Sequence, residues 1–480
     1  MTAEPFRVAV LGGGITGLSA AFYLHRFAER LGRPIRVTLL ESSDRLGGRI
    51  DTLRREGYVI ERGPDSFLAR KTAMIDLARD LGLDKELAYT SPLARTTYIV
   101  HRGRLHPMPD GLMMGVPSDL GALARTGVIS PVGKLRAACD LFLPRRGEDG
   151  DEAVGEFLRR RLGREVAERI AEPLLAGIHA GDPDRLSLRA TLPQFADLER
   201  KYGSLIRGMA AVRGRSAPAN LPPEARGRTF LSFRRGLYSV VEALERRLLR
   251  DGCAIRFGAA AVSLERNAPD GAPYRIVAEN GMEVAADAVI VAVPAPAAAR
   301  LLEPHVDVEA LRRVEYVSVA NVALGYDARR FGHKLDGSGF LVPRGEGRVI
   351  TASTWTSTKW PHTAPAGKRL LRCYVGRAGD ETAVHLPDDS LAYAVKRDLR
   401  DLMDLTARPE LVVISRHRNA MPQYAVGHLE RIAELRRQLE NRLPGVMVTG
   451  SALEGVGLPD CAAQGRKSAA ALLGLPAGAR

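Results

Sequence analysis

Near the N-terminus, Gly12-Gly13-Gly14-Ile15-Thr16-Gly17 has the spacing Gly-x-Gly-x-x-Gly. The first glycine permits a tight turn, Gly14 lets the backbone approach a pyrophosphate, and Gly17 allows a helix to pack closely on a strand. The N-terminus of that helix would direct its N–H groups at phosphate oxygens. Glu41, which ends the next apolar run, would accept hydrogen bonds from a ribose. We therefore expect dinucleotide contacts from five residues: Gly12, Gly13, Gly14, Gly17 and Glu41.

A second group of glycines follows Glu41, in Arg45-Leu46-Gly47-Gly48-Arg49. The two glycines bring the backbone close to a bound cofactor, and arginine can bind a phosphate through two N–H groups at once. A glycine turn with a surface arginine is the simpler alternative. The pattern resembles the flavin-containing amine-oxidase-like superfamily, in which it supports FAD. This resemblance favours FAD over other dinucleotides and implies contacts from Gly48 and Arg49.

Two further segments have residue types that suit the surroundings of a flavin. Glu61 to Phe67 predicts a rigid turn, which as a plain Pro-Asp turn would need no ligand. The residues that could contact the isoalloxazine or ribityl group are Gly63, Pro64, Asp65 and Ser66. Near the C-terminus, Thr449-Gly450 and Glu454 to Cys461 predict a strand, a glycine-rich turn and a helix start. Such a helix N-terminus can stabilise the negative charge that builds on a flavin during its reduction.

Hydrophobic periodicity indicates the elements that position these motifs. Strands are expected at 7–11, 36–40, 254–257, 261–266, 274–278, 288–293 and 446–449, and they belong to a nucleotide-binding domain. Strands of a second sheet are expected at 319–324, 348–353 and 370–375. Helices are expected at 17–31, 72–81, 132–141, 153–162, 236–250, 390–405 and 429–443, and from about 461. The segment 207–228 is rich in Gly, Pro, Ala and Arg without a period, which predicts a flexible loop.

Composition narrows the range of partners. The chain has 480 residues and a net charge of +14, from 70 basic and 56 acidic residues. An acidic small molecule, an anionic membrane surface or nucleic acid would suit this excess, although arginine usage alone could produce it. Dispersed arginines and an aromatic content of 5% argue against nucleic acid. The apolar stretch Val284 to Ala299 is broken by prolines, so it cannot span a bilayer, and at most peripheral membrane association is expected.

The cysteines and histidines predict neither a metal site nor a disulfide framework. The four cysteines are widely spaced, and the ten histidines are scattered without metal-ligand spacing. The first residues lack the charged start of a signal peptide. We therefore expect a cytoplasmic protein without a metal ion.

Seven segments, in chain order, resemble the oxygen-dependent coproporphyrinogen III and protoporphyrinogen IX oxidase family of haem synthesis, in its soluble Bacillus-like type. These segments are Gly12–Gly17, Glu61–Phe67, Leu105–Pro109, Glu172–Asp182, Ser318–Gly325, Met421–Tyr424 and Gly455–Cys461. The resemblance covers almost the whole chain, and the middle and C-terminal segments are more specific than the glycine pattern.

The resemblance implies a reaction and its cofactor. It implies a FAD-dependent oxidation that removes six electrons and six hydrogens from coproporphyrinogen III, with oxygen as oxidant and coproporphyrin III and hydrogen peroxide as products. Protoporphyrinogen IX is the alternative substrate. Coproporphyrinogen carries four carboxylates and protoporphyrinogen two, so the positive net charge slightly favours the former. No catalytic side chain is assigned, because hydride passes to flavin N5. A haem-pathway enzyme that collects the product is a possible partner, and the oligomeric state stays open.

The resemblance also extends the list of site residues. Further flavin contacts are implied for Val262 (through its backbone, to adenine), Val456, Gly457 and Leu458, and for His417, where the family often has Trp. Substrate contacts are implied for Lys71, Gly177, Ile178, Leu341 and Tyr374. Lys71 could pair with a propionate of the substrate or be an exposed cation at a helix start, and the Gly177 backbone could face the ring nitrogens.

The predicted fold class is α/β (α+β overall), with a Rossmann-like FAD-binding domain interleaved with a mixed-sheet substrate domain and a helical domain. The FAD-binding domain would comprise 1–70, 229–300 and 444–480, and the substrate-binding domain 71–98 and 301–443. The helical domain would comprise 99–210, and the flexible loop 207–228.

Three other readings of the same fold compete with this one. A flavin amine oxidase would usually place an aromatic pair near the late motif, and Glu454 to Cys461 contains no aromatic residue. A carotenoid desaturase would take a long apolar substrate, which would hardly favour a basic protein. A non-catalytic protein that escorts a lipid-modified partner would tend to lose the flavin motifs, which are intact here.

Overall fold

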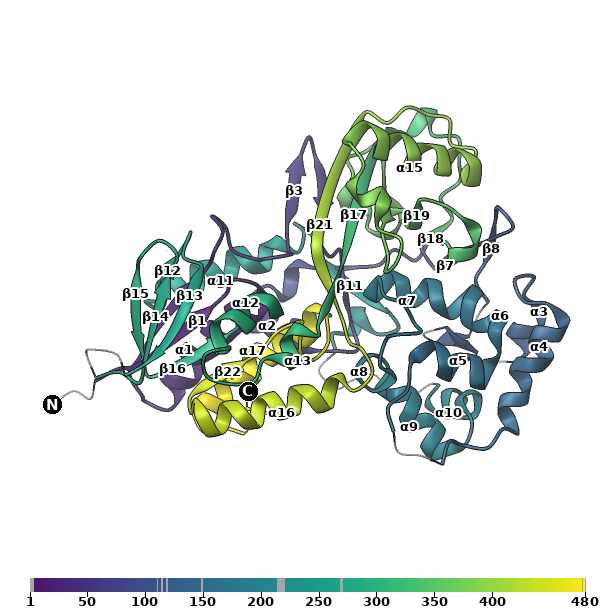
Figure 1. Cartoon of the computed structure of the whole chain (residues 1–480). Helices are drawn as coiled ribbons and strands as arrows, with labels where there is room; N and C mark the ends of the chain where they lie inside the picture. The colour runs from purple at the N-terminus through teal and green to yellow at the C-terminus, as the bar shows by residue number, and fades with distance from the viewer. Residues whose placement is uncertain are drawn as a thin grey trace.

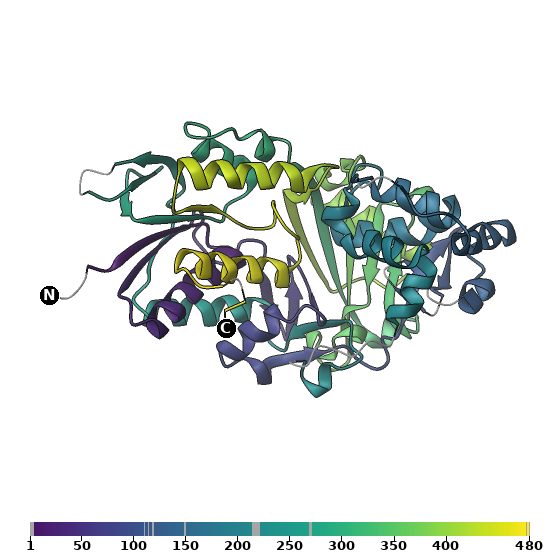
Figure 2. The same ribbon diagram turned by 90° about the horizontal axis from the view of Figure 1, so that it is seen from below.

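The computed structural model describes residues 4–109, 111–113, 115–117, 120–147, 150–213, 221–267, 271–476 and 478–479. Figure 1 shows a parallel sheet with β1 at the left end, a group of helices at the right end, and a larger sheet with β17 and β21 between and above them. In the view from below, the green strands of the larger sheet again lie between the two ends (Figure 2).

The parallel sheet is assembled from distant parts of the chain. Its strand order is β12 (Ala254–Arg256), β2 (Ile35–Leu40), β1 (Phe6–Leu11), β16 (Ala288–Val291) and β22 (Val446–Val448). The apolar run of β1 is buried on both faces, as a central parallel strand requires. Helices α1 (Ile15–Arg30), α11 (Tyr238–Arg250) and α17 (Leu458–Leu472) pack together beside it. The Rossmann-like domain predicted from the sequence is confirmed.

Two strands expected near this sheet form a separate small sheet. β13 (Ala261–Arg266), β14 (Tyr274–Ala278) and β15 (Glu283–Ala286) make an antiparallel meander. Their short connections, which include the turn at Asn280-Gly281, suit antiparallel rather than parallel pairing.

The larger sheet is mixed, as predicted. Its order is β21 (Leu411–Gln423), β17 (Glu315–Asp327), β20 (Lys368–Val375), β19 (Ile350–Thr354), β18 (Gly337–Leu341), β7 (Thr96–His101) and β8 (Arg104–Pro107). Among these pairs only β18 and β7 run parallel. The strands β7 and β8 place residues 96–107 in this sheet, so the boundary expected between residues 98 and 99 cuts through a strand.

Helices from the middle of the chain form the group at the right of Figure 1. They include α4 (Pro131–Ala138), α5 (Val154–Leu162), α7 (Glu172–His179), α9 (Pro193–Tyr202) and α10 (Leu205–Val212). The loop predicted at 207–228 is wrong at its start, because α10 extends to residue 212; residues 214–220 lie outside the described residues. The Ser204 side chain caps α10, and Leu205, Ile206 and Met209 bury one face of it.

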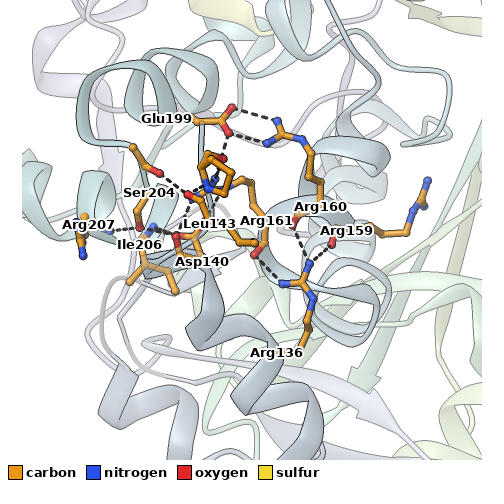
Figure 3. Close-up of polar contacts among 12 residues, drawn as sticks. Arg136, Asp140, Leu143, Arg159, Arg160, Arg161, Glu199, Ser204, Ile206 and Arg207 are labelled. Atoms are coloured by element: carbon orange, nitrogen blue, oxygen red, sulfur yellow. Dashed lines mark hydrogen bonds and ion pairs between the residues drawn. The ribbon is translucent and has the colours of Figure 1, made fainter. Parts of the chain in front are cut away.

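A buried network of charges joins several of these helices (Figure 3). Arg161 of α5 and Asp140 are both fully buried, and Arg161 Nε donates to Asp140 Oδ1 at 2.5 Å. Arg161 also donates to Glu199 Oε1 of α9 at 3.3 Å. Asp140 Oδ2 accepts from Ser204 Oγ and from the Ile206 backbone N–H at the start of α10. Because both partners are fully enclosed, each charge depends on the other for compensation.

Candidate cofactor and substrate site

The glycine-rich turn after β1 leaves an opening for an anion. The Gly12 N–H donates to Leu40 O at 2.8 Å and the Gly13 N–H to Glu41 Oε2 at 2.7 Å, which fixes the turn against β2. A Cβ at Gly17 would lie 1.9 Å from Gly12 O, whereas a Cβ at Gly14 would meet nothing within 4 Å. Helix α1 begins at Ile15 with no capping side chain and no acidic residue in its first turn. This end of α1 fits a pyrophosphate.

The purine side of the predicted cofactor site lies around Glu41, which is 9% exposed. Its Oε1 accepts from the Ser43 N–H and Oγ, both at 2.8 Å, so the carboxylate is already oriented. The Ala259 N–H donates to the backbone carbonyl of Glu41 at 2.9 Å, which brings the segment before β13 beside Glu41. Val262 falls at an irregularity of β13, has no partner in the ladder and is 52% exposed. Its backbone is therefore free of strand pairing, and the contact with adenine stays a prediction.

The Gly47–Arg49 turn lies against the first motif. The Gly47 N–H donates to Gly13 O at 2.8 Å, and Arg45 Nη2 donates to Gly48 O at 2.8 Å. Arg45 therefore stabilises the turn instead of pointing at a ligand. Arg49 has no acidic side chain within ion-pair distance among the described residues, and partial burial lowers the pKa of its guanidinium. Arg49 Nη2 donates to Asn419 O at 3.5 Å. A guanidinium without an ion pair among the described residues suits a phosphate, and this contact stays a prediction.

The turn at Gly63–Ser66 is held by the larger sheet. A Cβ at Gly63 would lie 1.7 Å from Arg49 O, so the two motifs touch. Arg372 of β20 donates to Gly63 O, and its Nε donates to Asn321 Oδ1 at 2.9 Å. Sequence reasoning missed Asn321 and Arg372; a signal was available, because both are polar residues inside otherwise apolar strands.

Arg62, just before this turn, accepts two side-chain hydrogen bonds at its carbonyl oxygen. Asn321 Nδ2 donates to it at 2.7 Å, and His417 Nε2 lies 2.5 Å from it. Burial is the main cause that lowers the pKa of His417, which keeps the ring neutral. His417 is thus placed beside the flavin motifs by its bond to the turn, and a direct contact with the flavin stays a prediction.

Asp65 gathers the polar groups beside this turn. Ser66 Oγ donates to Asp65 Oδ1 at 2.7 Å and Tyr374 OH to Oδ2 at 3.4 Å, while Lys359 Nζ and Arg372 Nη1 lie 3.9 and 3.8 Å from Oδ2. Burial alone would raise the pKa of Asp65, but the two cations together with the hydrogen bonds from Ser66 and Tyr374 lower it. Burial raises the pKa of Tyr374 to about 12, so the phenol stays a donor. An ionised carboxylate therefore lies at the predicted flavin edge.

The late motif forms the expected strand, glycine-rich turn and helix, and the helix begins before the start expected at about 461. Helix α17 begins at Leu458, with Gly457 as its uncapped first flanking residue. A Cβ at Gly465 would lie 2.3 Å from Thr16 O, so α17 crosses α1 in close contact. Lys71 Nζ is 2.7 Å from both carboxylate oxygens of Asp460, in the first turn of α17. Lys71 is therefore ion-paired within the protein while 43% of its side chain stays exposed, which agrees with the alternative of an exposed cation near a helix start, and its contact with a substrate stays a prediction.

The other predicted substrate residues lie on facing elements. Gly177 and Ile178 are exposed on α7, and a Cβ at Gly177 would lie 3.8 Å from Leu341 Cδ2 of β18. Leu341 is paired with Ala352 of β19, which is paired with Tyr374 of β20. Leu341 and Tyr374 thus lie in one row across the sheet, two strands or about 10 Å apart. Their contact with a substrate stays a prediction.

The buried carboxyl group of Glu61, just before the Gly63 turn, allows a test of the structure around this turn. Glu61 accepts from the Leu237 N–H at 2.6 Å and Thr52 Oγ1 at 2.7 Å, and burial raises its pKa from 4.5 to about 7. The folded state therefore holds this proton more tightly than the unfolded chain. We expect the free energy of unfolding to fall by about 3 kcal/mol between pH 4.5 and 7 through this group.

Glu61→Gln should remove the contribution of Glu61 to the pH dependence of the unfolding free energy. Urea unfolding of both proteins at several pH values measures it. Equal slopes of unfolding free energy against pH in the two proteins would contradict the assignment.

Comparison with known proteins agrees with this geometry. Residues 15–473 match the model of the flavin containing amine oxidoreductases. The chain is 43% identical to coproporphyrinogen III oxidase of Bacillus subtilis (strain 168), over 96% of each chain. It is 32% identical to the chloroplastic protoporphyrinogen oxidase of Nicotiana tabacum, over 94% of this chain and 82% of that one. A solved structure from Exiguobacterium sp. 255-15 superposes with a TM-score of 0.84 at 37% identity, covering 98% and 99% of the two chains.

The fold and the cofactor site define a FAD-dependent oxidoreductase. The chain belongs to the flavin containing amine oxidoreductase family and, within it, to the coproporphyrinogen and protoporphyrinogen oxidases. The residues described above would hold the FAD: the α1 turn and Arg49 at the phosphates, Glu41 at the ribose, and the Gly63 and Gly457 turns at the isoalloxazine.

Proposed function

We propose that this enzyme oxidises coproporphyrinogen III to coproporphyrin III in haem synthesis, with oxygen as the oxidant and hydrogen peroxide as the second product. The macrocycle would lose six hydrogens, and three molecules of oxygen would yield three of hydrogen peroxide. The observation that carries this proposal is the 43% identity to coproporphyrinogen III oxidase over 96% of each chain. Protoporphyrinogen IX is the second candidate, because the Nicotiana relative is named for it.

Each part of the site has a role in this proposal. FAD, when bound, supplies the acceptor for hydride and the route of electrons to oxygen. The Gly63 turn, braced by Arg372, would orient the cofactor, and the ionised Asp65 and neutral Tyr374 would keep a fixed electrostatic field at its edge. The exposed backbone of Gly177 and the exposed side chain of Ile178 would contact one face of the macrocycle.

Steady-state oxidation of the two porphyrinogens tests the assignment. Purified protein with bound FAD is mixed aerobically with coproporphyrinogen III or protoporphyrinogen IX, and porphyrin fluorescence and hydrogen peroxide are followed. A higher kcat/KM for coproporphyrinogen III, with three peroxides per porphyrin, is expected. Preference for protoporphyrinogen IX would reverse the order of the two candidates, and inactivity on both would reject both.

Lys71 gives a second test, because an incoming propionate would compete with Asp460 for it. Lys71→Ala should raise the KM for coproporphyrinogen III about fivefold, the scale of a partly exposed charge pair, and should spare the FAD content. Asp460→Asn removes the partner of Lys71 within the protein and should lower KM. An unchanged KM in Lys71→Ala would remove Lys71 from the substrate site.

The location of the enzyme belongs to the same proposal. Within the part of the chain that the structure describes, no helix is long and apolar enough to cross a membrane. We retain the sequence-based expectations of a cytoplasmic enzyme, at most peripherally attached to a membrane, and of a haem-pathway partner that receives the product.

A further inference from the structure

A group of charges at the start of α7 is not used by the flavin site. Glu172, the first residue of α7, is 8% exposed, and Arg377, after β20, is 1% exposed. Arg344, just after β18, keeps 43% of its side chain exposed. Arg344 Nε lies 3.9 Å and Arg377 Nη1 3.8 Å from Glu172 Oε1. Arg377 Nε also lies 3.6 Å from Asp380 Oδ2, so the buried Glu172 faces both guanidinium groups while Arg377 shares a second carboxylate.

The hydrogen bonding of this group is incomplete. The distances of 3.8 Å from Arg377 Nη1 and 3.9 Å from Arg344 Nε to Glu172 Oε1 are too long for hydrogen bonds. Glu172 Oε1 and Arg377 Nε are buried and have no hydrogen-bond partner among the described residues. Within the described part of the chain, the Arg344 guanidinium makes one hydrogen bond, from Nη2 to Ala378 O at 3.0 Å, and it has five N–H donors. Buried polar groups that are left unsatisfied require an explanation, and free guanidinium donors suit a carboxylate ligand.

The position of Arg344 relates it to the substrate face. Helix α7 packs across β18, β19 and β21, with Glu172 beside Arg344 at one end and His179 at the other. The His179 carbonyl accepts from Gln423 at 3.0 Å. Burial and, secondarily, the charge of Lys71 lower the pKa of His179 to about 4. The eight residues of α7 separate these ends by about 10 Å. The exposed Gly177 and Ile178 therefore belong to a helix that has Arg344 at its first end and Lys71 near its last.

We propose that Arg344, held in place by Glu172, which Arg377 in turn orients, binds a propionate of the porphyrinogen at the end of α7 opposite Lys71 and thereby selects coproporphyrinogen III. The inference rests on the proposed function. Coproporphyrinogen III carries a propionate on every pyrrole, so carboxylates can meet both ends of α7 at once. Protoporphyrinogen IX carries its two propionates on neighbouring pyrroles, at one edge of the macrocycle, and would present an uncharged edge to the other end of α7. Arg344 is thus a specificity-determining contact, and Glu172 and Arg377 are positioning residues.

Kinetics of Arg344→Met with both porphyrinogens test the proposal. The KM for coproporphyrinogen III should rise about tenfold, and the ratio of kcat/KM for coproporphyrinogen III over protoporphyrinogen IX should fall about tenfold, because one charge-assisted hydrogen bond to a carboxylate is lost. Arg344→Lys, which retains the charge without the planar fork, should lie between the two. The matched control is Arg369→Met, which removes an exposed arginine from β20 that bonds only the Lys368 carbonyl among the described residues.

Binding of coproporphyrin III, followed by fluorescence quenching, gives a readout that needs no turnover. The dissociation constant should rise about tenfold in Arg344→Met and stay unchanged in Arg369→Met. An unchanged dissociation constant, or equal losses of kcat/KM on both porphyrinogens, would overturn the role of Arg344. Failure of the proposed function would look different from failure of this inference. In that case the wild-type protein itself would oxidise neither porphyrinogen.

Discussion

Gly17→Ala is expected to yield a protein that binds no FAD and is less stable by about 3 kcal/mol or more, the upper range for overpacking. The new Cβ would lie 1.9 Å from Gly12 O, far inside any nonbonded contact. Gly12 cannot move away, because its N–H is bonded to Leu40 O and a Cβ at Gly12 would itself lie 2.7 Å from Ala292 O. Flavin absorbance of the purified variant and its unfolding in urea measure both effects.

Gly14→Ala is the matched control for this prediction. Its Cβ would meet nothing within 4 Å, and its backbone has an ordinary φ of −71°. The apoprotein should therefore unfold like the wild type, while FAD binding weakens, since the methyl group enters the space assigned to the pyrophosphate. Full FAD affinity in Gly14→Ala would contradict the placement of the pyrophosphate at this turn.

Arg161→Met should destabilise the helical part by about 3–5 kcal/mol, because it leaves the fully buried Asp140 without its compensating charge. Asp140 would retain its bonds from Ser204 Oγ and the Ile206 N–H, which are too few to replace a guanidinium. The change should appear as a lower midpoint of urea unfolding.

Two companion variants separate the loss of a charge from the loss of a buried charge. Arg164→Met removes an arginine two residues after α5 that is 80% exposed and paired with Glu168, and its midpoint should match the wild type. Asp140→Asn combined with Arg161→Met should recover part of the lost stability. A wild-type midpoint for Arg161→Met alone would show that the network carries no net stability.

The parts of the site that depend on local sterics could be predicted from the sequence. The spacing of Gly12 to Gly17 specifies a turn between strand and helix, and the structure shows why Gly17 can carry no side chain. The apolar runs of β1, β2 and β16 likewise identify the central strands of a parallel sheet, because such strands are buried on both faces.

Contacts between distant segments could not be predicted in this way. Lys71 and Asp460 are 389 residues apart, and neither residue type indicates the other. The bond from Arg372 to Gly63 also depends on how two domains meet. Strand β21 was missed because Arg416, His417 and Arg418 interrupt its apolar alternation; Arg416 instead donates to the Val384 and Leu386 carbonyls.

The most direct test of the central claim is anaerobic mixing of the FAD-loaded protein with coproporphyrinogen III, followed by the absorbance of oxidised flavin. The account predicts that this absorbance is lost in the absence of oxygen and returns when oxygen is admitted, with porphyrin and hydrogen peroxide formed. Flavin that stays oxidised in the presence of coproporphyrinogen III, and of protoporphyrinogen IX in the parallel experiment, would contradict porphyrinogen oxidation by this enzyme.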